Sequence, residues 1–368
     1  MATSLPQAAP AAGTVEFVAD PTAPAALSPR QQVWRRLRRD KAALLGAMAL
    51  IVLLIVALAG PTVLERWLDR PAESVNANAQ DFLRGRTLAP DNWALRPDAP
   101  ASFRIDKQGN AVSPDVLLKL CNSPKRPANA CWYYPLGSDG AVGHDELMWL
   151  VKGARTSLVV AFGATIISMF LGVVLGSLAG FLGGIVDSVV SRTIEIIMAF
   201  PITLFIIALA AIGREYRNIT LGGVFPKGAL MVMVVISVFG WYYPARVVRG
   251  QVLALREKEF VEAARMLGAP RRRIIFTHIL PYLVAPIIVY STLILAQNVL
   301  AEAGLSFLGV GIDPSEPSWG NLLATATQYF KTSPLVMLLP GAALLLLTIA
   351  TNLLGDGLRD AFDPRSTL

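Results

Sequence analysis

The sequence predicts an all-α integral membrane protein with six transmembrane helices. Of its 368 residues, 54% are hydrophobic and only 16% are charged, whereas about a quarter of a soluble domain is charged. The apolar residues lie in long runs, and a helix needs about 20 residues to cross a bilayer. Six uncharged stretches reach or approach that length: 42–60, 156–186, 196–213, 228–245, 279–301 and 332–355.

The first stretch could be a cleaved signal peptide or a retained span. Ala57-Leu58-Ala59 fits the cleavage pattern, and basic residues precede the apolar run. The run has 19 residues, whereas the apolar core of a signal peptide has about 7–15. We therefore predict a retained first helix with its basic flank at 34–60. The Ala- and Pro-rich segment 1–33 is expected to be a disordered N-terminus.

Basic residues predict the orientation in the membrane. Residues 30–41 carry six of them and residues 246–273 carry eight. Four predicted crossings separate these segments, so both lie on one side, and the excess of Lys and Arg assigns that side to the cytoplasm. Both termini, including the tail 356–368, are therefore expected in the cytoplasm. The exterior segments are then 61–150, 214–227 and 302–331, and the net charge of +7 does not indicate nucleic-acid binding.

The exterior segment 61–150 is polar and rich in Pro, and it could form a small lid or a loose loop, with a short hairpin at 102–110. Cys121 and Cys131 both lie in it, ten residues apart. Because the exterior is oxidising, we predict a disulfide, with two free thiols as the alternative. The only histidines, His144 and His278, are expected on opposite sides of the membrane, so no metal site is predicted.

Glycine and proline positions predict a packed helix bundle. Gly172, Gly176 and Gly180 recur every fourth residue, which lets a neighbouring helix approach closely. Gly183-Gly184 is expected to end the second span, and Pro201, Pro244, Pro281, Pro286 and Pro340 are expected to kink helices or lie at their ends.

The residues also exclude several classes of function. The six predicted spans contain no Asp, Glu, Lys, Arg or His. Glu195 and Glu302 lie just outside the ends of two of them. Secondary transporters usually carry such residues for ion coupling, so that class, like an ATP-independent channel, is a weaker alternative. Motifs for nucleotide hydrolysis, metalloprotease or serine-hydrolase chemistry are absent from the sequence. We predict a protein that is no enzyme and binds no cofactor directly.

The segment 256–281 between the fourth and fifth stretches is the most informative. A short helix is expected at 258–267, because Phe260, Ala264 and Leu267 share one face. Gly268 supplies a C-cap and Pro270 blocks continuation. A structured cytoplasmic link of this length favours a docking element, with a plain connection or a basic helix resting on anionic lipid as alternatives.

Glu262-Ala263-Ala264, followed by Gly268 and by Ile279-Leu280-Pro281, resembles the EAA loop of membrane subunits of ATP-binding-cassette importers. In that family the loop forms a coupling helix that lies in a cleft of the ATPase subunit. The resemblance implies coupling contacts at Phe260, Glu262, Ala263, Ala264, Arg265, Leu267 and Gly268.

Further motifs resemble the C-type permease subunit of dipeptide and oligopeptide importers. They are 135–139, 245–252, 302–309 with 317–320, and 352–360 with 363–365, and the resemblance covers 30–60 and 133–366. It implies the type I importer permease fold, with a permease core of five spans at 151–355. Two departures are the spacing at 139–145 and the long exterior segment with its cysteines.

The resemblance implies a bacterial inner-membrane protein that transports by alternating access. The expected partners are a second homologous permease subunit, two ATPase subunits that hold ATP and Mg, an extracytoplasmic solute-binding protein and the lipid bilayer. Peptides are the first expectation for the solute; nickel complexes, glutathione, haem and oligosaccharides remain open. A membrane-anchored binding module is disfavoured, because one span would suffice for it.

Candidate pathway residues are Tyr242, Tyr243, Ser291, Gln297 and Asn298, with helix packing or an interfacial aromatic belt as the alternative role. The exterior mouth that faces the binding protein is expected at Glu302, Phe307 and Trp319.

Overall fold

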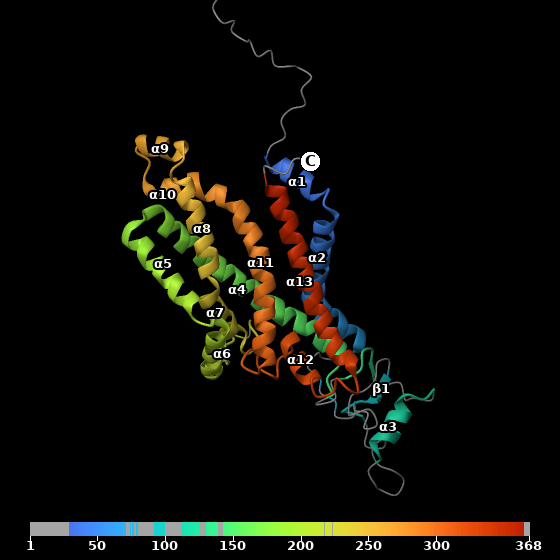
Figure 1. The fold of residues 1–368 in the computed structure, drawn as a ribbon. Coiled ribbons are helices and arrows are strands. Elements are labelled where there is room, and N and C mark those ends of the chain that lie inside the picture. Colours follow the sequence, from blue (N-terminus) through green and yellow to red (C-terminus); the bar gives the residue numbers. More distant parts are fainter. Residues whose placement is uncertain are drawn as a thin grey trace, which may run out of the picture.

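Long helices run between the two ends of an elongated bundle, and a small insert with two short strands lies at one end (Figure 1). The computed structural model describes residues 29–70, 74, 76, 79, 92–99, 112–124, 130–138, 143–216, 218–222 and 224–363. The main elements are α1 (Pro29–Leu37), α2 (Lys41–Leu68), β1 (Asn92–Leu95), α3 (Pro114–Cys121), β2 (Cys131–Tyr134), α4 (Glu146–Leu182), α5 (Gly184–Ala199), α6 (Ile202–Ile212), α7 (Ala229–Gly240), α8 (Tyr242–Leu255), α9 (Glu259–Met266), α10 (Arg271–Arg273), α11 (Leu280–Phe307), α12 (Trp319–Ala326) and α13 (Pro334–Phe362).

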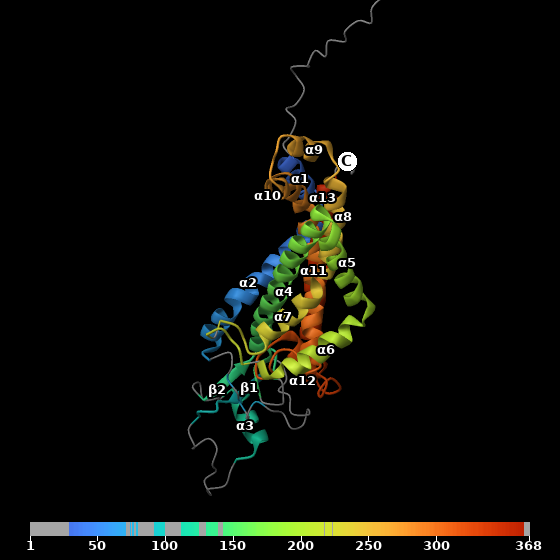
Figure 2. The same ribbon diagram turned by 90° about the vertical axis from the view of Figure 1, so that its left-hand side faces the viewer.

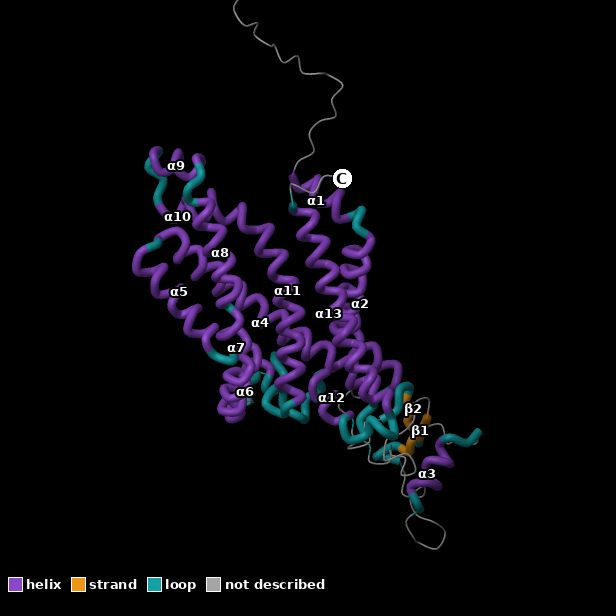
Figure 3. The backbone as a smooth tube through the Cα atoms, viewed as in Figure 1, coloured by secondary structure: helices purple, strands orange, loops and turns teal. Residues whose placement is uncertain are grey.

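Within the described residues, five helices are long and apolar enough to cross a membrane, or up to six if the bent pair α5 and α6 counts as one span. The predicted all-α membrane class is therefore confirmed. The ends of α1, α9 and α13 lie together at one end of the bundle, and α3, β1, β2 and α12 lie at the other (Figures 1 and 3).

The third span differs from the prediction. A single helix was expected at 196–213, but α5 begins at Gly184 and the chain bends by 90° between α5 and α6 (Figure 2). Phe200 and Pro201 form the break, where Pro lacks the amide hydrogen that would continue the helix. The prediction was wrong because Arg192 and Glu195 ended the uncharged stretch, whereas the helix continues through both residues.

Helix ends also extend beyond the predicted spans. The side chain of Asp40 accepts hydrogen bonds from the amides of Ala42 and Ala43 and so starts α2, which continues to Leu68. Disorder was predicted for 1–33, but α1 already begins at Pro29, and 1–28 lie outside the described residues. The tail expected at 356–368 is helical as far as Phe362, because α13 continues.

The glycine series of α4 packs against α8, which is the close approach of a neighbouring helix that the sequence predicted. A Cβ added at Gly176 would lie 2.5 Å from the carbonyl oxygen of Ala245, and one added at Gly180 would lie 2.9 Å from that of Arg249. At Gly172 it would lie 2.7 Å from the side chain of Pro244. Only the missing Cβ lets the two backbones approach this closely, so α4 and α8 pack in close contact along this face.

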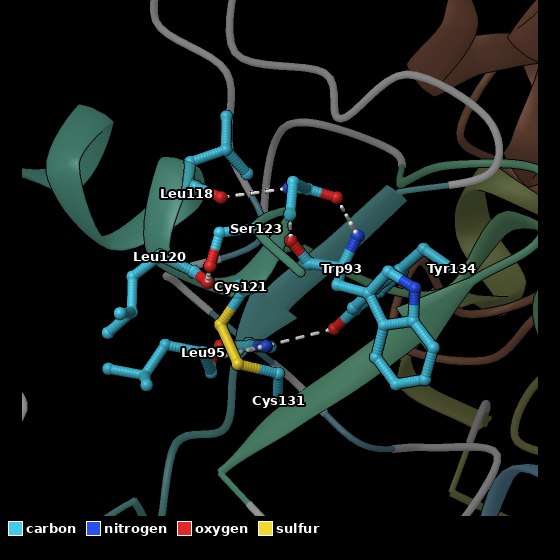
Figure 4. The surroundings of a disulfide bond; sticks show 10 residues. Trp93, Leu95, Leu118, Leu120, Cys121, Ser123, Cys131 and Tyr134 are labelled. Atoms are coloured by element: carbon cyan, nitrogen blue, oxygen red, sulfur yellow. Dashed lines mark hydrogen bonds between the residues drawn. A yellow bond between two sulfur atoms is a disulfide. The ribbon is translucent and has the colours of Figure 1, made fainter. Parts of the chain in front are cut away.

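The described part of the exterior segment is folded, which overturns the alternative of a loose loop for these residues. Strands β1 and β2 pair antiparallel, with Leu95 opposite Cys131. The predicted disulfide between Cys121 and Cys131 joins the end of α3 to the start of β2 (Figure 4). Asn122 then bonds both backbone groups of Trp93 at 2.9 Å, which attaches the end of α3 to β1. The hairpin expected at 102–110 lies outside the described residues.

A buried arginine joins this insert to the bundle. Arg70 follows α2, and its guanidinium donates to the carboxylate of Asp145 and, at 2.7 Å, to the carbonyl of Tyr133. The same guanidinium lies 4.2 Å from the ring centre of Tyr134. Asp145 also accepts the amide of Met148 at 2.9 Å and caps α4. One buried ion pair therefore links α2, β2 and the start of α4.

Asn76 reinforces the same junction. Its amide donates to the carbonyl of Leu95 and to the phenol oxygen of Tyr134, both at 3.0 Å. Burial raises the pKa of Tyr134 to about 12, against the opposing effect of Arg70. The phenol therefore stays neutral at physiological pH, and among the described residues Asp145 is the carboxylate that pairs with Arg70.

Candidate functional site

Helix α9 is an amphipathic helix whose inner face packs against the bundle. Val261 is fully buried and Ala264 is 7% exposed. Both belong to a core cluster with Ile274, Ile279 and Leu283, which lie in the π-helical turn 274–279 and the start of α11. The ring of Phe260 also stacks on that of Tyr282, 5.1 Å between centres. Helix α9 is therefore attached firmly to the fifth span.

The C-terminus of α9 is closed by glycine, as the sequence predicted. Gly268 has φ of +76°, which suits a residue without a Cβ. Its amide donates to the carbonyl of Arg265 at 2.9 Å, and the amide of Ala269 donates to that of Ala264 at 3.0 Å. These two bonds form a Schellman motif, which satisfies the last carbonyls and turns the chain sharply.

The outer face of α9 is exposed, and its composition corrects one prediction. Leu267 was expected to share a face with Ala264, but Leu267 is 88% exposed whereas Ala264 is buried. Met266 is 83% exposed, and Glu262, Ala263, Arg265 and Gly268 are exposed as well. The difference arises because the helix ends at Met266, so Leu267 already lies in the cap and points away. Ala263 therefore faces outward, and Ala264 faces inward.

Two arginines connect the α9 region to the end of α4. The guanidinium of Arg256, after α8, donates to the carbonyl of Gly180 at 3.2 Å. That of Arg265, on α9, lies 5.7 Å from the ring centre of Phe181. Cations at a helix C-terminus interact favourably with its dipole. Helix α9 and the residues beside it therefore contact α4, α8 and α11.

A second feature is a hollow between α5 and α8 that the sequence analysis missed. It measures about 540 Å³ and is lined by Ser191, Ile194, Glu195, Met198, Ala199, Arg246 and Arg249. The sequence analysis defined spans as stretches without charged residues, and it therefore placed the charged residues of this hollow outside the spans. The prediction that the spans contain no charge was wrong. Helices α7 and α8 together form one candidate span, Ala229–Leu255, and this span includes Arg246 and Arg249.

The sequence agrees with known proteins over most of its length. Residues 172–368 match the family of binding-protein-dependent transport system inner membrane components. The chain belongs to this family. Residues 28–83 also match the N-terminal transmembrane domain of oligopeptide transport permease C. The predicted transport component of an ATP-binding-cassette importer, which is not itself an enzyme, is thereby confirmed.

Curated relatives carry transport names. A protein of Brucella ovis named as a peptide permease is 38% identical over 256 residues, which is 69% of this chain and 79% of the relative. The dipeptide transport system permease protein of Alkalihalophilus pseudofirmus is 37% identical over 247 residues, covering 66% and 75%. The oligopeptide transport system permease protein of Haemophilus influenzae is 37% identical over 233 residues, covering 63% and 71%.

In this binding-protein-dependent permease, two of the residues expected at the exterior mouth are buried. Trp319 is 1% exposed, and its indole nitrogen donates to the carbonyl of Leu150 at 3.1 Å. Glu302 is fully buried and accepts a hydrogen bond from Ser306 at 2.8 Å. The expectation that both face a binding protein was wrong, because they pack against α4 and the loop after α11. Phe307 is 43% exposed and is the one that can reach a partner.

Of the expected pathway residues, Asn298 and Ser291 have packing roles in the permease. Asn298 is buried and donates to Thr165 of α4 at 2.9 Å, a bond between two spans. Ser291 bonds the carbonyl of Ile287 within its own helix at 2.7 Å. Gln297 is exposed.

The two tyrosines at the start of α8 differ in exposure. Tyr242 is half-buried and packs beside Val190 and Ile194 of α5. Tyr243 is 48% exposed and meets the ring of Tyr290 edge-on. Gln297 and Tyr243 therefore remain candidate pathway residues.

Proposed function

We propose that the chain is the C-type permease subunit of an ATP-driven peptide importer. With a second, homologous permease subunit it forms the pathway for peptides that an extracytoplasmic binding protein delivers. The names of the relatives support peptides as the solute. The observation that carries the mechanism is α9, a helix fixed to three spans on its inner face and exposed at Met266 and Leu267 on its outer face.

Helix α9 is the contact to an ATPase subunit in this proposal. Exposed apolar residues at the tip of a rigid element suit a protein partner. ATP and Mg are held by two ATPase subunits, and their closure pushes α9. Because Val261 and Ala264 join α9 to the base of α11, and Arg256 joins α8 to α4, the push reaches all three spans at once. The ATPases bias a two-state bundle between an outward-open and an inward-open form.

Chemistry at the two ends supports the proposed orientation. The disulfide insert suits an oxidising exterior. The opposite end carries Arg35, Arg36, Arg38 and Arg39 around α1 and the basic segment before α11, as expected for the cytoplasm. We infer a bacterial inner-membrane location with both termini cytoplasmic, with the insert outside.

The test is transport coupling in a reconstituted complex of both permease subunits, both ATPases and the binding protein. Leu267→Glu places a charge on the exposed tip of α9, and Leu267→Met is the matched control that keeps the tip apolar. We expect Leu267→Glu to lower ATP-driven uptake of trialanine about tenfold or more at normal protein levels, with the control near the wild type. Equal uptake by Leu267→Glu and the wild type would refute the coupling role.

A further inference from the structure

Charged side chains lie deep along the face formed by α5 and α8. Glu195 is eleven residues from the start of α5 at Gly184, and Arg246 is nine residues from the end of α8 at Leu255. At 1.5 Å per residue Glu195 lies about 16 Å along α5 from its start, and Arg246 lies about 13 Å from the end of α8. Both residues therefore lie more than two helical turns inside candidate membrane spans, whose hydrocarbon environment is about 30 Å thick.

These charged groups are exposed on the isolated chain. Arg192 and Glu195 pair at 2.8 Å with side chains 77% and 63% exposed, and Arg246 is exposed as well. Ionised groups at this depth are costly against lipid and in membrane proteins face the bundle interior or a water-filled cavity. The α5–α8 face is therefore a wall of the aqueous pathway or of the subunit interface.

Arg246 lacks a counter-ion within the described chain. Its neighbour Arg249 forms a bidentate ion pair with Asp187 of α5, and Glu195 is paired with Arg192. Arg246 contacts the sulfur of Met198 at 3.8 Å and makes no ion pair with any described residue. An arginine without a counter-ion inside a membrane span is expected to bind an anion.

The surrounding hollow is large enough for a small ligand. Its volume of about 540 Å³ lies within the range of about 300–1,000 Å³ typical of ligand sites. It is lined by both the guanidinium of Arg246 and the carboxylate of Glu195. The pair of Glu195 with Arg192 is exposed, and exposed pairs contribute little. A ligand with a carboxylate at one end and an ammonium at the other therefore complements the charges of Arg246 and Glu195.

We propose that Arg246 binds the C-terminal carboxylate of a peptide in transit, with Glu195 facing its positive end. This proposal rests on the proposed function, because it needs a peptide in the pathway. A guanidinium can bind a carboxylate through two parallel hydrogen bonds. In this proposal the hollow is the part of the pathway that selects the substrate in this subunit. Asn298 of α11, which was expected in that role, packs against α4 instead.

Uptake by the reconstituted complex tests the role of the charge. Arg246→Gln is expected to lower ATP-driven uptake of trialanine about tenfold or more, whereas Arg246→Lys retains part of it. Arg66→Gln removes an exposed arginine from α2, outside the hollow, and should transport as the wild type does. The ATPase activity stimulated by the loaded binding protein should persist in Arg246→Gln, because α9 is unchanged. If Arg246→Gln takes up trialanine as fast as the wild type, the inference is overturned and the proposed function stands. If the wild type itself takes up no trialanine, the proposed function is overturned.

Thiol labelling separates a substrate site from a subunit contact. Both native cysteines are joined in the disulfide, so Arg246→Cys introduces the only free thiol of this chain. In a complex whose partners lack accessible thiols, a water-soluble methanethiosulfonate should modify it, and trialanine during turnover should slow the modification. Modification that occurs only without the second permease subunit would show a contact between subunits and overturn the inference.

Discussion

The two ends of the bundle are stabilised in different ways. At the insert end, the disulfide, the β1–β2 pair and the buried ion pair of Arg70 and Asp145 bond the chain to itself. At the other end, only the inner face of α9 is packed, and Met266 and Leu267 remain exposed. The first end is stabilised by bonds within the chain, whereas in the proposed function an ATPase subunit covers the second. Changes at the insert should therefore affect folding, and changes on the outer face of α9 should affect coupling.

The largest effect is expected where the insert meets the bundle. Arg70→Ala leaves the carboxylate of Asp145 buried without its partner, and breaking such a pair costs about 3–5 kcal/mol. We expect a strong fall in the thermal unfolding midpoint in detergent, with poor accumulation in the membrane. Arg66→Ala, four residues earlier on an exposed face of α2, is the control and should change little. Equal midpoints for Arg70→Ala and Arg66→Ala would show that the ion pair does not hold the insert.

The disulfide should contribute next. Replacing Cys121 and Cys131 together by Ser opens a loop of ten residues, and a bond of this kind contributes about 2–4 kcal/mol. We expect faster proteolysis of the insert and an unchanged α9 end. In the native protein, a membrane-impermeant thiol reagent should label neither cysteine until a reductant is added. Labelling of both without reductant would contradict the bond, and protection after reduction in intact cells would contradict the exterior location.

Two neighbouring alanines sharpen the comparison within α9 itself. Ala264→Trp forces a large ring into the cluster with Val261 and Ile279, and overpacking of this kind costs about 1–3 kcal/mol. Ala263→Trp points outward and should leave the unfolding midpoint unchanged while lowering ATP-driven uptake. Thermal unfolding and uptake are measured on both variants. Loss of stability in Ala263→Trp, or none in Ala264→Trp, would reverse the assignment of the two faces.

The smallest effect is expected at the cap of α9. Gly268 lies at φ of +76° with no heavy atom close to the position of an added Cβ, so the cost of Gly268→Ala is backbone strain of about 1 kcal/mol. We expect a slight loss of coupling with a normal bundle. Gly250→Ala, in helical α8 with equally open space, is the control and should not lower stability. A loss of stability in both variants alike would show that the conformation of Gly268 is not the cause.

Features governed by local geometry were predictable from the sequence. The spacing of Gly172, Gly176 and Gly180 predicted close helix packing, and Gly268 predicted the end of α9, because each depends on a few neighbouring residues. The pairing of Cys121 with Cys131 followed from their location and number.

Features set by tertiary packing were not predictable. Trp319 resembles an exposed interfacial anchor in the sequence, yet Leu150 and Ser157 of α4 bury it. Charges within α5 and α8 ended the predicted spans, although the helices continue through them. In a subunit of a larger complex, charged residues can lie at bilayer depth because a partner or the pathway shields them from lipid. A search for uncharged stretches therefore misses the polar face of such a subunit, including Arg246.

The central claim is that the outer face of α9 receives the motion of an ATPase subunit. A photo-reactive phenylalanine analogue at Leu267, which is 88% exposed, tests it in the assembled complex. We expect ultraviolet light to cross-link this position to the ATPase subunit and to stop ATP-driven uptake, whereas the same analogue at the exposed Val116 of the insert leaves the ATPase unlabelled. Capture of lipid alone from position 267, with uptake intact after illumination, would contradict the claim.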